Sequence, residues 1–196
     1  MTKKRKQTFG GNSMKTLLVG FKKYASHDSN PSERILARYI GKKGIQTVLL
    51  EASYDKARKN LEKAIAKDKP DFILVLNLSP FHKHPTLEQY GYNEMDSVQP
   101  DENGVIKTKE EILPGESKSL STSYDLSRFN QILIANEVES TMSIDGGRFF
   151  DNEAYYVALH SGTPALMIHL PLESEYSLDE DEKLIDAILE IVSKNV

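Results

Sequence analysis

Short apolar runs alternate with amphipathic segments along most of the chain, and this alternation constrains the fold more than any other feature. The apolar runs predict strands at residues 17–20, 45–50, 72–76, 140–144 and 165–170. Helical spacing of apolar side chains predicts helices at residues 31–43, 54–67, 126–135, 152–160 and 179–194. Strands that alternate with helices are typical of a parallel sheet covered on both faces. We therefore predict a three-layer α/β/α fold with a mixed, mainly parallel sheet.

The complete lack of cysteine restricts the chemistry open to this chain of 196 residues. It excludes disulfides, zinc–thiolate and iron–sulfur sites, and any cysteine nucleophile. Because disulfides are rare in reducing compartments, their absence fits an intracellular protein, and we expect a cytoplasmic one. No apolar run approaches the roughly 18 residues that a membrane-spanning helix needs, so we expect no membrane contact.

The first 13 residues differ in charge from the rest of the chain. They contain Lys3, Lys4, Arg5 and Lys6 without an acidic residue, whereas the whole chain has a net charge of -4. We predict that residues 1–13 form a basic, flexible tail and that 14–196 form a single domain. A structural or nucleic-acid-associated protein that uses this tail stays open as one alternative function, and we expect no nucleic-acid contact elsewhere.

Polar residues that follow the predicted strands are candidates for a functional site. In open α/β sheets, ligands bind beyond the carboxyl ends of the strands. Asp151 closes the polar segment after the fourth predicted strand, and His169 lies at the end of the last one. Glu88 lies within residues 79–115, which hold four of the eight prolines. That segment is too long for an ordinary connection, so it is either a functional excursion or an added hairpin.

Five motifs occur in order between about residues 15 and 172. They are Gly20-Phe21 with Asn30-Pro31-Ser32; Glu88 with Asn93; Pro100-Asp101, Gly104, Glu110, Ile112 and Pro114-Gly115; Ser143, Gly147, Phe149, Asn152, Tyr156, Leu159 and His160; and Ile168-His169-Leu170-Pro171. In residue type and spacing they resemble the pyroglutamyl peptidase I family (pyrrolidone-carboxylate peptidases), cysteine enzymes that remove an N-terminal pyroglutamate. The resemblance implies the same fold and places Glu88 and His169 where the family has its catalytic glutamate and histidine.

The departures from the family pattern lie at the positions where the resemblance implies catalytic and pocket residues. Asp151 stands where the resemblance implies the nucleophilic cysteine, and His82 stands where it implies an arginine that helps to bind the oxyanion. Leu78 replaces a pocket glutamine. The resemblance implies a ligand pocket at these positions: Phe21, Tyr24, Leu78, His82, Phe149 and Phe150.

Replacing a thiolate by a carboxylate changes what the site can do. A carboxylate that attacks an amide gives a mixed anhydride, and its charge opposes the oxyanion of a tetrahedral intermediate. Loss of one member of a catalytic triad costs roughly 10⁴ to 10⁶ in rate. We therefore expect no cysteine-type peptidase activity. A simpler structural role for Asp151 is to cap the predicted helix 152–160.

The sequence leaves several functions open. We predict a catalytically degenerate relative that binds a small ligand or a peptide N-terminus in the old pocket, or that serves as an assembly component. The alternative is an active hydrolase in which Asp151 and His169 activate water and Glu88 orients the histidine. We expect no cofactor and no metal, because the candidate ligand residues match no compact metal motif. The resemblance implies a dimer or tetramer, and the sequence fixes no number.

Overall fold

The computed structural model of the protein describes residues 14–25 and 27–194. Its strands are β1 (Thr16–Phe21), β2 (Ile45–Leu50), β3 (Phe72–Leu78), β4 (Thr86–Glu88), β5 (Tyr90–Tyr92), β6 (Ser119–Ser121), β7 (Thr141–Ser143) and β8 (Ala165–Leu170). Its helices are α1 (Pro31–Tyr39), α2 (Lys56–Asp68), α3 (Leu126–Ala135), α4 (Phe150–His160) and α5 (Leu178–Ser193). The predicted basic tail, residues 1–13, lies outside the described residues.

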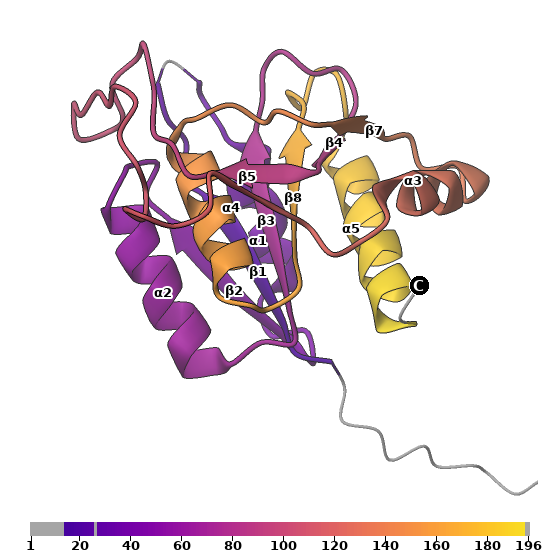
Figure 1. Cartoon of the computed structure of the whole chain (residues 1–196). Coiled ribbons are helices and arrows are strands. Elements are labelled where there is room, and N and C mark those ends of the chain that lie inside the picture. Colours follow the sequence, from indigo (N-terminus) through magenta and orange to yellow (C-terminus); the bar gives the residue numbers. More distant parts are fainter. Residues whose placement is uncertain (1–13, 26, 195–196) are drawn as a thin grey trace, which may run out of the picture.

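In the described part of the chain, six strands form the main sheet in the order β2-β1-β3-β8-β4-β7. The first four strands in this order run parallel, whereas β4 pairs antiparallel with β8 and parallel with β7. Helices cover both faces, with α2 and α4 on one side and α1, α3 and α5 on the other (Figure 1). The prediction of a three-layer fold with a mixed, mainly parallel sheet is therefore confirmed.

Two hydrophobic cores result from the alternation of side chains along the central strands. In β1, Leu17 and Val19 pack under α2 and α4, whereas Leu18 between them packs under the other three helices. The same alternation divides β3 and β8, all of whose residues are buried. Burial of both faces explains why these strands are nearly continuous apolar runs in the sequence.

Local signals at the helix ends fix most of the boundaries. The Asn30 side chain caps α1 by accepting a hydrogen bond from the backbone N–H of Ser32. The helix ends at Tyr39 rather than near residue 43, because Gly41 adopts a φ of 79° and turns the chain into β2. A capping box of Ser177 and Glu180 begins α5. The spacing of apolar residues therefore predicts where the helices lie, whereas capping residues and a glycine determine where they begin and end.

The long segment 79–115 contributes strands to two sheets, and within it Met95 and Glu110 form an antiparallel bridge, as an added hairpin would. Its strand β4 joins the main sheet between β8 and β7, and β5 pairs with β6 in a separate two-stranded sheet of the described chain. The loop that follows is anchored by the buried carboxylate of Asp101, which accepts hydrogen bonds from the backbone N–H groups of Tyr54, Asn103 and Val105. These anchors hold the loop over the α2 and α4 side of the sheet.

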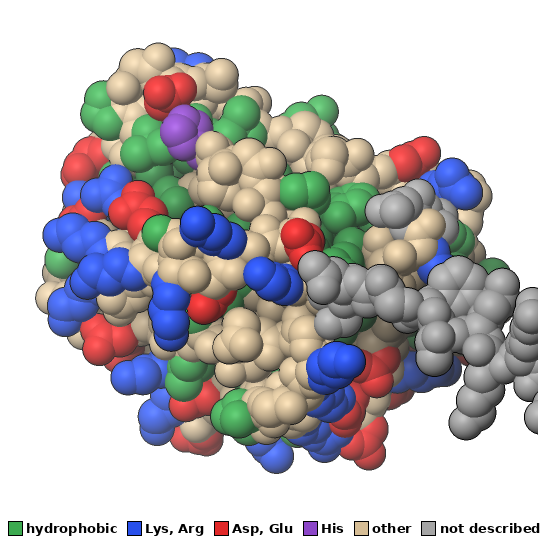
Figure 2. All heavy atoms as spheres, turned by 90° about the horizontal axis from the view of Figure 1, so that it is seen from below, with side chains coloured by type: hydrophobic (Ala, Val, Ile, Leu, Met, Phe, Trp, Pro, Cys, Tyr) green, Lys and Arg blue, Asp and Glu red, His purple; other side chains and the backbone are tan. Residues whose placement is uncertain are grey.

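One face of the molecule carries charges of both signs. Figure 2 shows basic and acidic side chains mixed over the uncovered part of one face, with small separate hydrophobic areas between them. Across residues 14–25 and 27–194, no helix combines the length and the apolar character needed to cross a membrane. Both observations concern the described residues and leave the role of the tail a prediction.

Candidate active site

Sheet register brings Glu88 and His169 to the same face. In the antiparallel pairing of β4 with β8, Thr86 lies opposite His169 and Glu88 lies opposite Met167, so Glu88 and His169 are diagonal neighbours. In the parallel pairing of β3 with β8, Asn77 lies beside His169. All these side chains point toward α4, which packs on that face.

Asp151 enters the same region from the first turn of α4. Its Oδ2 lies 3.0 Å from Nε2 of His169, and Nδ1 of His169 lies 2.8 Å from Oε1 of Glu88. All three side chains are buried. The structure therefore brings Glu88, His169 and Asp151 into one hydrogen-bonded row, with the imidazole between two carboxyl groups. We call these three residues the acidic triad.

The prediction that Asp151 is the N-cap residue of its helix is wrong. The helix begins two residues earlier than expected, with Phe149 as the N-cap residue, and Asp151 lies within the first turn. Its Oδ1 still accepts a hydrogen bond from the backbone N–H of Asn152 at 2.9 Å. A carboxylate is favourable there because the helix dipole is positive at this end.

Electrostatics keep the histidine charged. Burial alone would lower the pKa of His169, but hydrogen bonds and the charges of Asp151 and Glu88 outweigh it and raise the pKa to about 9. Burial alone would raise the pKa of Asp151, but the hydrogen bond from His169 and its charge hold that pKa below its usual value. At neutral pH, His169 is therefore an imidazolium ion paired with the Asp151 carboxylate.

Further polar side chains form a chain of hydrogen bonds that ends on Asp151, and the sequence did not predict their role. Asn77 donates a hydrogen bond to Asp151 Oδ2 at 2.8 Å, and Asn30 donates one to Asn77 Oδ1 at 3.0 Å. The Ser32 hydroxyl donates to Asn30 Oδ1 at 2.8 Å. A polar residue at the end of an otherwise apolar buried strand, as Asn77 is, was the signal that could have identified this chain of hydrogen bonds.

Glu88 is held in a tight, buried environment. Its Oε2 is buried and has no hydrogen-bond partner among the described residues. The backbone of Gly146 covers it so closely that a Cβ at position 146 would lie 3.0 Å from the Glu88 carboxyl carbon. Tyr155 donates a hydrogen bond to the backbone oxygen of Glu88. The glutamate thus has one oxygen fixed on His169 and little room to move.

The predicted pocket residues have different surroundings. Tyr24 and Phe149 line an open cavity of about 690 Å³. Phe21 and Phe150 are completely buried in the core and contribute no surface. Their rings nevertheless support the cavity wall, since Phe150 lies 4.3 Å from Phe149 and 5.1 Å from Tyr24 between ring centroids.

The two positions that depart from the family pocket also lie near the triad. Leu78 is buried, and its backbone oxygen accepts a hydrogen bond from the Tyr24 hydroxyl at 2.7 Å. The His82 ring lies 5.7 Å from the His169 ring, and His82 Nδ1 contacts the Thr86 hydroxyl. Burial, and then the charge of His169, lower the pKa of His82. His82 is therefore a neutral side chain where the family pattern implies a cation.

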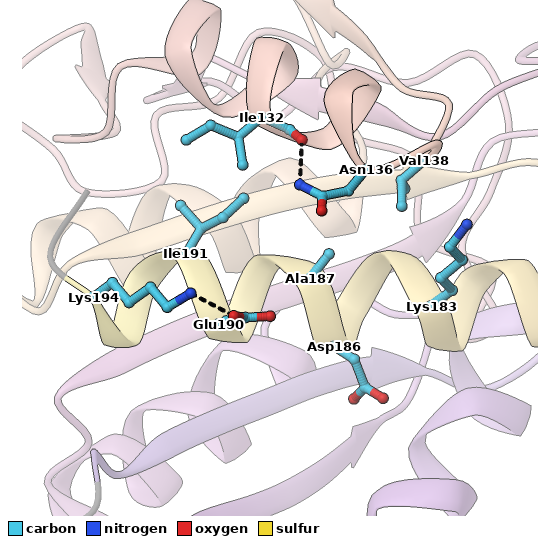
Figure 3. Close-up of a pocket in the computed structure, with 9 residues that line it drawn as sticks. All are labelled: Ile132, Asn136, Val138, Lys183, Asp186, Ala187, Glu190, Ile191 and Lys194. Carbon is cyan, nitrogen blue, oxygen red and sulfur yellow. Dashed lines mark hydrogen bonds and ion pairs between the residues drawn. The ribbon is translucent and has the colours of Figure 1, made fainter.

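Two other observations delimit the site. Among the described residues there is no cluster of three or more histidine, aspartate or glutamate side chains arranged to hold a metal ion. Another cavity, of about 710 Å³, lies between α3 and α5, and none of the triad residues lines it (Figure 3). In its wall Lys194 is ion-paired with Glu190, and the Asn136 side chain donates to the Ile132 backbone oxygen.

Comparisons with known proteins agree with this geometry. The family described as pyroglutamyl peptidase matches residues 14–185. The pyrrolidone-carboxylate peptidase of Pyrococcus furiosus is 27% identical over 177 residues, which cover 85% of each chain. That of Bacillus licheniformis is 24% identical over 178 residues, covering 86% of this chain and 83% of the relative.

A solved structure of pyrrolidone carboxyl peptidase from Pyrococcus furiosus shares the fold. It superimposes with a TM-score of 0.87 at 23% identity, over 93% of this chain and 99% of that one.

Proposed function

The chain belongs to the pyroglutamyl peptidase family, and from this membership we propose that it is a member without cysteine-peptidase activity that binds a small ligand or a peptide N-terminus. The observation that carries the proposal is the 3.0 Å contact between Asp151 Oδ2 and His169 Nε2. A histidine in this position activates a thiol by taking its proton. Here the same nitrogen is occupied by a carboxylate that has no proton to give and is a poor nucleophile toward amides.

The ion pair also opposes the charge changes of amide hydrolysis. A tetrahedral intermediate needs hydrogen-bond donors or positive charge aimed at its oxyanion. The acidic triad instead places the Asp151 carboxylate against the His169 imidazolium, and His82 supplies no compensating cation beside it. Both features act against an oxyanion next to Asp151.

Ligand binding is supported by the open cavity that Tyr24 and Phe149 line, which the triad residues themselves do not line. Its aromatic wall includes Phe149, two residues before Asp151, and Tyr24, whose hydroxyl bonds to the strand end at Leu78. Concave, largely apolar sites with a few polar groups are the usual form of small-molecule pockets. A cavity of about 690 Å³ is large enough for the end residue of a peptide.

The active-hydrolase alternative keeps one supporting observation, the convergence of Glu88, Asp151 and His169. Its difficulty is protonation, because an imidazole with a pKa of about 9 is not a base at neutral pH. This alternative therefore requires activity that rises with pH toward 9. An assembly role and homo-oligomerisation stay predictions that a measurement of solution mass would test.

A binding experiment tests the proposal. Thermal unfolding is followed with pyroglutamate amide, prolinamide and short peptides, since a ligand of the folded state raises the midpoint. Phe81 is 92% exposed and lines the cavity, so Phe81→Ala should leave the fold intact and weaken binding. Ile144→Ala, which truncates an exposed side chain outside the cavity lining, is the matched control. If none of these compounds raises the midpoint, ligand binding in this cavity is refuted.

A further inference from the structure

The charged groups around the aromatic cavity define what it can hold. Asp96 lines the cavity, and no side chain among the described residues hydrogen-bonds or pairs with its carboxylate. Arg148, the lining cation, is paired with Asp145 and lies over the Tyr92 ring at 3.6 Å from its centroid. The positive charge is therefore already compensated, whereas the negative charge of Asp96 is not.

Asp151 adds negative charge near the cavity wall. Its carboxylate lies in a buried region, where screening by water and salt is weak. Its influence reaches the cavity, since burial and then the charge of Asp151 raise the pKa of the Tyr24 hydroxyl. An anionic ligand would be repelled by this arrangement and a cation attracted.

The cavity wall offers aromatic surfaces suited to a cation. Tyr24 and Phe149 meet edge to face with 6.3 Å between ring centroids, and Phe81 lies at the surface beside them. The ring of His27, the remaining titratable group of the lining, packs edge-on against Tyr24. Faces of aromatic rings attract ammonium groups. Apolar atoms next to the ammonium would be buried by the same rings.

The cavity is less well equipped for a neutral lactam. Leu78 is a buried apolar side chain where the family pattern has a glutamine, so its side chain offers no hydrogen bond to a ring amide. The Tyr24 hydroxyl is committed to the Leu78 backbone oxygen. The Ser97 hydroxyl is buried without a partner among the described residues and lines the cavity, where it can accept one N–H.

We propose that this cavity binds an organic ammonium group on a small apolar body, such as the free N-terminus of a peptide, with Asp96 as its counter-ion and the rings of Tyr24 and Phe149 around it. The inference rests on the proposed ligand-binding function and specifies its ligand class. It separates this chain from a pocket built for an uncharged pyroglutamyl ring.

Two probes of nearly equal shape test the charge preference. Prolinamide carries a ring ammonium at pH 6.5, whereas pyroglutamate amide has the same ring as a neutral lactam. Titration calorimetry should show prolinamide binding at least tenfold more tightly, with affinity that falls as salt increases. Asp96→Asn should weaken prolinamide roughly tenfold, equivalent to about 1.4 kcal/mol, and leave pyroglutamate amide unchanged. Glu62→Gln, on an exposed face of α2 outside the lining, is the charge control.

The possible results separate the two proposals. Equal or tighter binding of pyroglutamate amide would overturn the ammonium inference and leave the ligand-binding function standing. An Asp96→Asn variant that binds prolinamide as the wild type does would also overturn it. If neither probe binds, both proposals fail. Replacing prolinamide by an N-terminal prolyl dipeptide distinguishes the sources, because a peptide-end site binds the dipeptide more tightly and a small-amine site does not.

Discussion

Replacing Asp151 by asparagine removes one charge from the acidic triad while keeping its shape. The single amide oxygen can accept from either Asn77 or the backbone N–H of Asn152, which donate to different oxygens of Asp151, so the change removes the ion pair with His169 together with one of these hydrogen bonds. Breaking a buried ion pair costs about 3 to 5 kcal/mol of unfolding free energy, and we expect the cost of Asp151→Asn at pH 6 to fall within this range.

The pH dependence supplies the sharper part of this prediction. The pKa of His169 is raised from 6.5 to about 9, so its stabilising contribution is complete below pH 6.5 and is lost as pH rises through 9. At 1.36 kcal/mol per pKa unit, this loss is about 3 kcal/mol in the wild type. With one carboxylate removed, the His169 pKa falls, and the loss shrinks to roughly half of that.

Urea unfolding at pH 6 and pH 9, together with an NMR titration of the His169 ring, measures both quantities. Asp145→Asn is the matched control, because it removes the same charge from an exposed pair with Arg148 and should cost less than about 1 kcal/mol. A His169 that titrates near 6.5 in the wild type would refute the reasoning. So would an Asp151→Asn protein that keeps the full loss of stability between pH 6 and pH 9.

Three further substitutions probe other parts of the structure. Burial raises the pKa of Asp181 to about 7, and its carboxylate has no hydrogen-bond partner among the described residues. Ionisation of Asp181 therefore destabilises the fold increasingly as pH rises from about 4 through 7. Asp181→Asn should stabilise the protein by roughly 1 to 3 kcal/mol at pH 8 and by much less at pH 5. Urea unfolding at both values checks this, and an equal gain at both would contradict it. Gly146→Ala places a Cβ 3.0 Å from the fixed Glu88 carboxyl carbon and should cost about 1 to 3 kcal/mol; an unchanged urea midpoint would show that Glu88 is free to move. Asp151→Cys introduces a cysteine into a chain that has none, and the nearby His169 should lower the thiol pKa, so that iodoacetamide labels it at pH 6.5 at least tenfold faster than in the matched His169→Gln double variant. Equal labelling rates would show that position 151 lacks the geometry of a nucleophile.

The main elements of the fold could be predicted because their signals are local. The apolar runs at residues 45–50 and 165–170 and the helical spacing at 126–135 coincide with β2, β8 and α3. β4 could not be found in this way. It has three residues, and its partners β7 and β8 lie far along the chain, so only tertiary pairing defines it as a strand.

Part of the candidate site can be predicted, because polar residues at the ends of strands and motif spacing both indicate its residues. His169 ends a strand, and motif spacing placed Glu88 and Asp151 beside it, where the structure brings all three together. The roles of these residues stay a prediction. Sequence reasoning overlooked Asn77 as a partner of Asp151, because the direction of a side chain at a strand end depends on the register with β8.

The helix cap was misassigned for a similar reason. Polar residues from Asp151 onward predict a helix start at residue 152. The aromatic residues Phe149 and Phe150 pack against the core, and the helix begins two residues earlier, at Phe150. The free energy gained by burying these two large rings outweighs the preference of an aspartate for the capping position.

The rate of hydrolysis of a pyroglutamyl-linked fluorogenic amide, measured from pH 6 to 9.5 for the wild type and Asp151→Ala, tests the central claim most directly. With His169 held in an ion pair by Asp151, both proteins should release the fluorophore at the rate of the buffer alone over the whole range. Turnover by the wild type that disappears in Asp151→Ala would contradict the claim and establish the acidic triad as a catalytic one.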